Sequence, residues 1–229
     1  MPTELPLPIE WLPTTGRPEQ LILLMHGWCG QAMDMAPLAQ ALRLAFPQAA
    51  VLAPEGPQVG DHGRGRQWYT VTDLNQDTWP ARVDSVLPML HQWVLAQQQR
   101  LGVAPAATAL GGFSQGALLP LCLVMQHDGL AGRVLAFGGI LPLPPQTAPR
   151  HTTLHLFHGA LDKVFPVAQV RERFEQLVAL HADATIDIAD QVGHELHPAL
   201  IDCALHRLRS HIPLRTWQAA LGAGQGLKT

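Results

Sequence analysis

The 229-residue sequence has few charged residues, few cysteines and no long run of basic or apolar residues. Charged residues make up 14% of the chain, the formal net charge is −3, and the basic residues are nearly all scattered arginines. This balance gives no sign of a surface that binds nucleic acid or acidic lipid. The three cysteines, Cys29, Cys122 and Cys203, are odd in number and form no cluster of the metal-binding type, so a reducing cytoplasm is the expected compartment.

The sequence also lacks a segment suited to membrane insertion. Its first residues do not combine a basic stretch with an apolar one, as a signal peptide would. The apolar run over residues 117–125 is too short to span a bilayer. We therefore expect no integral membrane association.

What the chain does contain is ample apolar material, 47% of its residues, which suffices for the core of one domain of this length. We expect a single domain over residues 1–229. Residues 1–18 are expected to form an irregular lead-in or edge segment, and residues 222–229 a flexible tail. No internal repeat indicates a second unit.

Apolar runs and amphipathic segments alternate along the chain. The runs predict buried strands at 21–25, 49–54, 106–110, 133–137, 152–157 and 184–188. Helices are expected at 32–46, 78–100, 117–125, 166–180 and 196–210, the second kinked by Pro88 and the last broken early by Pro198. Residues 59–75 are expected to form a long surface loop and 141–149 a rigid one. The alternation predicts an α/β fold with a mostly parallel central sheet and helices on both faces.

The segment before the helix at 117–125 contains the pattern Gly112-x-Ser114-x-Gly116. A sharp strand-to-helix turn strains the backbone at the serine, and side chains two positions to either side would collide, so glycine is needed at both. The serine hydroxyl is then exposed above the sheet, beside the positive N-terminus of the helix. Because glycine and serine are also common in ordinary turns, the pattern alone leaves a plain glycine-rich turn open.

A carboxylate and a histidine follow two later strands. Asp162 comes after the strand at 152–157, and His194 comes after the strand at 184–188. The carboxyl ends of parallel strands meet at one edge of a sheet, so we expect both side chains to lie near Ser114. A neutral imidazole can accept the serine proton, and a carboxylate can fix the imidazole tautomer. The order Ser, Asp, His along the chain is that of the α/β-hydrolases.

Both partners of the serine have competitors. Asp162 could instead be a turn or cap residue of the following helix. Asp187 and Asp190 are rival carboxylates, but Asp187 lies within a strand and Asp190 stands only four residues before His194. His197 is a rival base that falls in the closing helix. We therefore favour Asp162 and His194.

Three further histidines, His151, His155 and His158, could be read as a metal site. Strand alternation puts His151 and His155 on one side and His158 on the other. No Asp, Glu or Cys completes a ligand set. We expect neither a metal nor a cofactor.

Acyl transfer also needs two backbone N–H groups directed at the developing negative oxygen. We assign one to Gln115, the residue after the serine, and the other to Trp28, in the loop that follows the first strand. An ordinary turn at the end of that strand would have the same position in the sequence, so it is the alternative interpretation of this loop.

Four stretches together resemble the phospholipase/carboxylesterase family of the α/β-hydrolases, which includes acyl-protein thioesterases. They are Leu24–Gly27, Gly111–Ala117, the His-Gly-x-x-Asp-x-Val-x-Pro sequence of 158–166, and Gly193-His194. The resemblance spans roughly residues 20–212, and the stretch 65–69 also resembles a bacterial member. It implies a compact hydrolase with little or no lid that cleaves carboxylic esters of small or medium acyl chains.

The same resemblance implies that Trp28 and Trp68 border the acyl pocket, although partly buried packing is an alternative for Trp68. The family usually has glycine where this chain has Cys29, with Gly30 following. The loop is therefore expected to differ in shape while keeping the Trp28 N–H. For Cys29 itself, packing is favoured over a role as an oxidisable thiol.

The favoured hypothesis is a serine carboxylesterase that acts on small-molecule acyl esters, as a monomer or homodimer and without a nucleic-acid partner. Ser114 would be the nucleophile, His194 the base and Asp162 its orienting acid. An acyl thioesterase or lysophospholipase-like hydrolase is the alternative within the fold. A non-enzymatic, hydrolase-like binding protein is disfavoured because all three residues are present.

Overall fold

The structure, a computed structural model, describes residues 5–225. Within them, a seven-stranded sheet has the order β1-β3-β2-β6-β7-β8-β9. The edge strand β1 (Ile9–Trp11) is antiparallel to its neighbour, and the others are parallel: β2 (Gln20–Met25), β3 (Ala49–Ala53), β6 (Thr108–Phe113), β7 (Arg133–Phe137), β8 (Thr153–Gly159) and β9 (Ala184–Ala189). The mostly parallel sheet and its six predicted strands are confirmed, with boundaries shifted by a few residues.

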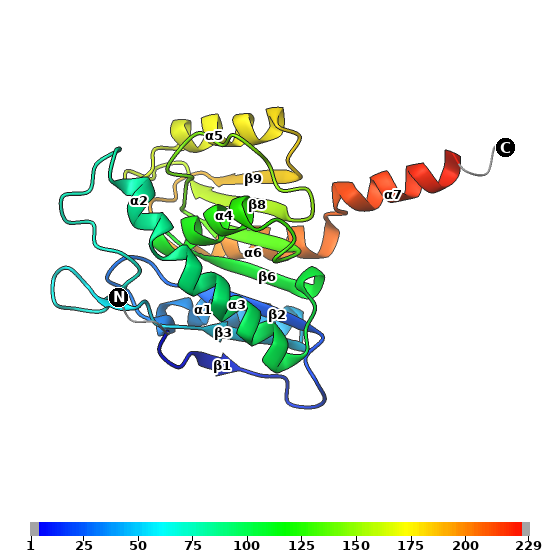
Figure 1. Cartoon of the computed structure of the whole chain (residues 1–229), viewed down its shortest axis with the longest axis horizontal. Helices are drawn as coiled ribbons and strands as arrows, with labels where there is room; N and C mark the ends of the chain where they lie inside the picture. The colour runs from blue at the N-terminus through cyan, green and yellow to red at the C-terminus, as the bar shows by residue number, and fades with distance from the viewer. Residues whose placement is uncertain (1–4, 226–229) are drawn as a thin grey trace.

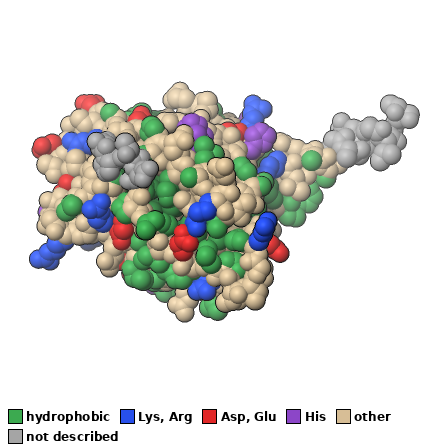
Figure 2. All heavy atoms as spheres, turned by 60° about the horizontal axis from the view of Figure 1, so that its bottom comes forward, with side chains coloured by type: hydrophobic (Ala, Val, Ile, Leu, Met, Phe, Trp, Pro, Cys, Tyr) green, Lys and Arg blue, Asp and Glu red, His purple; other side chains and the backbone are tan. Residues whose placement is uncertain are grey.

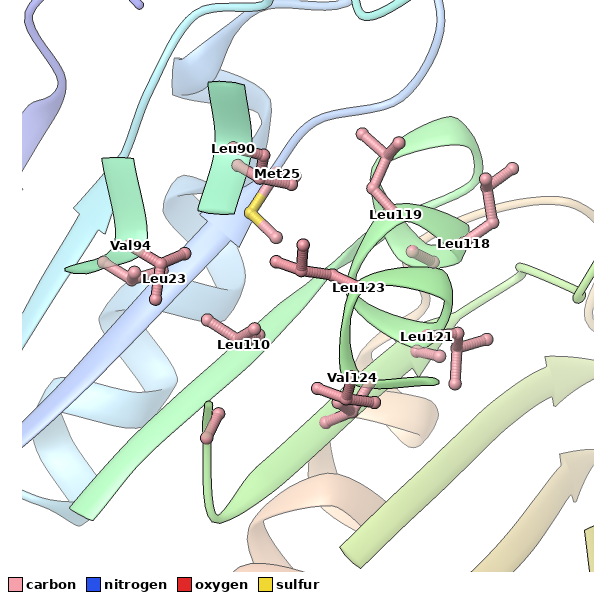
Figure 3. Packing of buried hydrophobic residues seen from close by; sticks show 14 of the residues in the cluster. Leu23, Met25, Leu90, Val94, Leu110, Leu118, Leu119, Leu121, Leu123 and Val124 are labelled. Atoms are coloured by element: carbon pink, nitrogen blue, oxygen red, sulfur yellow. The ribbon is translucent and has the colours of Figure 1, made fainter. Parts of the chain in front are cut away.

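The central strands are buried on both faces because successive apolar residues point to opposite sides. In β2, Leu21 and Leu23 belong to one hydrophobic cluster, whereas Ile22 and Leu24 belong to the other. Figure 3 shows the first cluster, where strand residues meet helix side chains that include Leu90, Val94, Leu119 and Leu123. The continuous apolar runs of the sequence therefore have partners on both sides.

Helices cover both faces of the sheet, as predicted (Figure 1). On one side lie α1 (Ala36–Ala45) and α6 (Pro198–Ser210). On the other lie α3 (Leu87–Leu101), α4 (Gln115–Gln126) and α5 (Val167–Ala179). Two short 3-10 helices, η1 (Ala32–Met35) and η2 (Pro105–Ala107), complete these layers.

Two prolines act differently from the prediction. The helix expected over 78–100 is two helices, α2 (Trp79–Asp84) and α3, and Pro88 lies in the first turn of α3 instead of kinking one continuous helix. Pro198 likewise begins α6 and does not break a helix that started earlier. Both positions suit proline, because a backbone N–H in the first turn has no partner within the helix.

The two ends of the chain contain elements that the sequence patterns miss. Within the segment expected to be an irregular lead-in or an edge segment, β1 forms an edge strand, which fits the second alternative. At the other end, α7 (Leu214–Gln225) extends away from the sheet (Figure 1). Its helical backbone includes residues 222–225 of the expected tail, whereas residues 226–229 lie outside the described residues.

The segment of residues 54–78 between β3 and α2, here called the β3–α2 connection, contains the long loop expected over residues 59–75, which is exposed in part and buried in part. Its short strands β4 (Gln58–Val59) and β5 (Arg66–Gln67) pair in antiparallel fashion. Trp68 and Tyr69 are only 0% and 3% exposed. The prediction of a surface loop is wrong at this point, because the aromatic pair packs into the core.

The low charge of the sequence is visible on the surface. Figure 2 shows one face, on which hydrophobic side chains gather and charged ones are scattered singly between and around them. In the part of the chain that the structure describes, no helix combines the length and apolar character needed to cross a bilayer.

Candidate active site

Ser114 occupies a strained turn between β6 and α4. Its φ is 54° and its ψ is −118°, in a region that disfavours residues with a Cβ atom. A Cβ added at Gly112 would collide with the carbonyl oxygens of Met25 and Gly116, and one at Gly116 would collide with those of Met25 and His26. The predicted reason for both glycines is confirmed: the turn is packed tightly against the backbone at the end of β2.

Three side chains from three loops meet above this turn. His194 Nε2 lies 2.8 Å from Ser114 Oγ, and His194 Nδ1 lies 2.7 Å from Asp162 Oδ2. Ser114 follows β6, Asp162 follows β8 and His194 follows β9, so all three lie at the carboxyl edge of the sheet. The structure thus brings together the three residues that the sequence analysis singled out.

The Asp162 side chain is fully buried, and both of its oxygens have hydrogen-bond partners. Its Oδ1 accepts hydrogen bonds from the backbone N–H groups of Val164 (2.8 Å) and Phe165 (2.9 Å). Its Oδ2 faces His194 Nδ1 and also His158 Nε2, at 3.3 Å. These contacts stabilise the ionised carboxylate in a buried position.

The competing residues have other partners. Both carboxylate oxygens of Asp187 accept hydrogen bonds from Arg207, at 2.8 and 2.9 Å. Asp190 is exposed. His197 is the N-cap of α6, where its Nδ1 accepts a hydrogen bond from the Ala199 N–H at 3.2 Å. No hydrogen bond joins any of these described side chains to Ser114 or His194, whose side-chain partners are each other and Asp162.

A cavity of about 460 Å³ opens beside Ser114 and His194. Its walls are mostly apolar and come from the loop after β2, the β3–α2 connection, the turn around Ser114, here called the elbow, and the segment after β8. The lining residues are Gly27, Trp28, Tyr69, Val71, Leu74, Trp79, Phe113, Ser114, Gln115, Leu118, Val164, Phe165 and His194. Its size suits a small organic ligand, for which pockets range over about 300–1,000 Å³.

The two tryptophans expected at the pocket behave differently. Trp28 lines the cavity and is 37% exposed, and its Nε1 donates to Asp61 Oδ2 at 3.3 Å. Trp68 is fully buried, its Nε1 donates to the His26 carbonyl at 2.9 Å, and it is not among the described residues that line the cavity. Trp68 therefore packs in the core, which is the alternative given for it, and does not border the cavity; Tyr69 lines the cavity instead.

Gln115 fixes the wall of the cavity through its side chain. Its Oε1 accepts the backbone N–H of Trp68 at 2.9 Å, and its Nε2 donates to the Tyr69 carbonyl at 2.8 Å. The Tyr69 hydroxyl in turn accepts a hydrogen bond from Trp79 Nε1 at 3.0 Å, and the Trp79 ring stacks on Phe165. The residue after the serine therefore holds the β3–α2 connection over the site.

Sequence analysis missed Asp61, the polar centre of this connection. Its carboxylate accepts hydrogen bonds from Gln67 Nε2 (2.7 Å), Thr70 Oγ1 (2.6 Å), the Val71 N–H (2.8 Å) and Trp28 Nε1. Desolvation alone would raise the pKa of Asp61, but these hydrogen bonds outweigh it and lower the pKa to about 2. No local sequence signal identifies such a residue, because its partners lie up to 33 positions away.

Cys29 has a backbone conformation that favours glycine. Its φ is 51°, in the left-handed region, at the position where the resemblance leads one to expect glycine. Its Sγ contacts Gln67 Oε1 at 3.9 Å, so the thiol packs on the β3–α2 connection. The loop therefore has the shape that glycine would allow, although a side chain is present.

The three histidines considered as metal ligands have separate roles. His151 is exposed. His155 is fully buried with Nδ1 2.8 Å from Thr185 Oγ1, and burial, with nearby Arg133, lowers its pKa to about 3. His158 Nε2 lies 2.7 Å from the Phe165 carbonyl. Within residues 5–225, no group of three or more His, Cys, Asp or Glu side chains is placed to hold a metal ion.

The sheet order, the strained turn at Ser114 and the positions of Asp162 and His194 define the chain as an α/β-hydrolase by fold. The crystal structure of esterase PE8 superposes with a TM-score of 0.83 at 26% sequence identity, covering 91% of this chain and all of that one. The α/β-hydrolase fold is confirmed.

The chain belongs to the phospholipase/carboxylesterase family, whose model matches residues 12–212. It is 36% identical to esterase YpfH of Escherichia coli K12 over 207 residues, which are 90% of this chain and 89% of that protein. It is 27% identical to acyl-protein thioesterase 1 of Gibberella zeae over 209 residues, which are 82% and 86% of the two chains. Membership of this family confirms the prediction of a hydrolase that acts on ester bonds.

Proposed function

We propose that the protein is a serine carboxylesterase that hydrolyses small to medium acyl esters through an acyl-enzyme intermediate. The observation that carries the proposal is the chain of short contacts from Asp162 through His194 to Ser114, at the mouth of an apolar cavity. This arrangement supplies a nucleophile, a base and an orienting acid in hydrogen-bond reach of one another.

The proposed reaction begins when Ser114 Oγ attacks the acyl carbon while its proton passes to His194 Nε2. Asp162 holds Nδ1–H and stabilises the imidazolium that forms. The backbone N–H groups of Gln115 and Trp28 bind the oxyanion, and the N-terminus of α4 adds a favourable dipole. His194 then protonates the leaving alkoxide, and a water molecule activated by the same imidazole hydrolyses the acyl-enzyme.

Acyl thioesters are a second candidate substrate class. The same attack would expel a thiolate, and the apolar walls of the cavity suit an acyl chain on either kind of ester. The likeness to acyl-protein thioesterase 1 supports this alternative. A monomer or homodimer in the cytoplasm remains the expected form of the protein.

The decisive experiment is turnover of p-nitrophenyl esters from acetyl to palmitoyl, with matched thioesters, by the wild type and Ser114→Ala. We expect activity on short and medium chains and a loss of about 10⁴-fold or more in kcat for Ser114→Ala, as for other triad nucleophiles. Ser210→Ala, an exposed serine at the end of α6, is the matched control and should retain full activity.

Labelling with a fluorophosphonate probe separates the enzyme from a binding protein of the same fold. Label on Ser114, absent from the Ser114→Ala variant, supports the proposal. A wild type that neither labels nor turns over any ester or thioester would favour the non-enzymatic alternative.

A further inference from the structure

A second histidine contacts the acid of the proposed triad. His158, in β8, is 1% exposed, and its Nε2 lies 3.3 Å from Asp162 Oδ2 and 2.7 Å from the carbonyl oxygen of Phe165. The proposed mechanism assigns no step to this side chain. Its contacts nevertheless reach both the carboxylate and the segment that follows it.

The surroundings of His158 determine which nitrogen carries the proton. Both groups facing Nε2 are hydrogen-bond acceptors, so Nε2 must be protonated to avoid repulsion. Nδ1 is buried and has no hydrogen-bond partner among the described residues. An imidazolium would bury a second N–H without an acceptor, which is costly. His158 is therefore the neutral Nε2–H tautomer, and burial lowers its pKa accordingly.

This N–H forms its hydrogen bond with the carbonyl of Phe165, while Asp162 Oδ2, which accepts from His194, lies 3.3 Å from the same nitrogen. The N–H of Phe165 binds Asp162 Oδ1, and the Phe165 ring packs edge-on against the His194 ring at 5.7 Å. One donor therefore restrains the residue that holds the carboxylate through its backbone and contacts the base through its ring.

We infer that His158 is a positioning residue: its Nε2–H fixes the Phe165 carbonyl, and so the turn whose N–H groups hold the Asp162 carboxylate, and thereby sets the orientation and basicity of His194. This inference rests on the proposed function. The N–H groups of Val164 and Phe165 on Oδ1 draw negative charge away from the carboxylate, which weakens its stabilisation of a protonated His194. Without His158 these donors would be held less well, so His194 would be less well oriented and would bind its proton more tightly.

Few other ionisable groups act on this cluster. The charged or titratable groups that act on His158 are Asp162 and His194. His194 itself contacts Asp162 and Ser114, and otherwise the rings of Phe113 and Phe165. Lys163 and Glu195, the sequence neighbours, have exposed side chains. A change in the pH dependence of the reaction can therefore be attributed to this cluster.

The test compares His158→Leu, which removes the N–H at similar size, with His158→Gln, whose amide N–H reaches toward the Nε2 position. For His158→Leu we expect kcat to fall roughly tenfold, equivalent to about 1.4 kcal/mol. The acid limb of the profile of kcat/KM against pH should move to higher pH, because that limb reports the pKa of the catalytic base in the free enzyme. His158→Gln should restore most of both quantities.

His155→Leu is the matched control, because His155 is also fully buried in β8 but its ring contacts Thr185 and not Asp162. It should leave the acid limb in its wild-type position even if it lowers stability. A folded His158→Leu variant whose acid limb coincides with that of the wild type would overturn the inference, as would a Gln variant no better than the Leu variant.

A measurement on the wild type covers the case in which His158→Leu does not fold. In ¹⁵N-histidine NMR spectra, His158 should remain a neutral Nε2–H tautomer across the pH range in which His194 titrates. An Nδ1–H tautomer, or titration of His158 in step with His194, would refute the inference. A different result would contradict the proposed function itself, namely ester turnover or fluorophosphonate labelling that does not depend on Ser114.

Discussion

The elbow around Ser114 and the β3–α2 connection both border the cavity, but they are held in different ways. At the elbow, backbone atoms of β2 press against Gly112 and Gly116, so the serine is placed by contacts that leave no room for a Cβ. The β3–α2 connection is placed by polar side chains, chiefly Asp61 and Gln115, which hydrogen-bond to distant backbone groups. Nucleophile placement therefore depends on sterics, and the shape of the cavity depends on a few hydrogen bonds.

The largest expected effect is from Gly116→Ala, which adds a methyl group against two carbonyl oxygens. Overpacking against rigid backbone should lower the free energy of unfolding by about 3 kcal/mol or more. Gly102→Ala is the control, because Gly102 has a φ of 66° but open space around it, and should cost only about 1 kcal/mol. Denaturant unfolding measures both, and equal losses would show that backbone collision does not govern the elbow.

The next effect is from Asp61→Ala, which removes the acceptor shared by Trp28, Thr70 and Val71. We expect a roughly tenfold fall in kcat/KM, equal to about 1.4 kcal/mol, mostly through KM, because the cavity wall loosens while Ser114 stays in place. Asp77→Ala, an exposed carboxylate of the same connection, should have wild-type kinetics. A fall confined to kcat would indicate that Asp61 acts on the elbow instead.

The low pKa of Asp61 also predicts that the stability of the protein depends on pH. Its pKa in the folded protein, about 2, lies below the usual 3.8, so its contribution to stability is complete above pH 3.8 and is lost as pH falls toward 2. The stability difference between the wild type and Asp61→Asn should therefore be constant at neutral pH and shrink through that acid window. Urea midpoints at a series of pH values test this, and a difference that grows on acidification would contradict it.

The smallest effect is expected at Cys29, in the loop after β2 that packs on the β3–α2 connection. Cys29→Gly relieves a left-handed φ of 51° and should raise the free energy of unfolding by about 0.5 kcal/mol. Cys203→Gly, inside α6, is the contrasting variant and should lower it by about 1 kcal/mol. If Cys29→Gly also destabilises the protein, the packing of Sγ on Gln67 outweighs the backbone strain.

The contrast between the regions also explains what could be predicted from the sequence. Buried parallel strands and the strained turn follow from local patterns, so the six strands, Ser114 and the loops carrying Asp162 and His194 could be placed in advance. Trp68 could not, because its burial depends on hydrogen bonds to Gln115 and His26, 47 and 42 residues away. Likewise, β1 is too short to show a pattern and exists only through pairing with β3.

The spacing of the site along the chain has a consequence for how the protein folds. Ser114 and His194 are 80 residues apart, and each is carried by its own strand of a parallel sheet. Contacts between residues so far apart in the sequence form slowly, because the chain loses the entropy of closing a large loop before the contacts can stabilise it. During refolding, fluorophosphonate labelling should therefore appear only when the part of the sheet from β6 to β9 has formed, and lag behind the recovery of helical circular dichroism.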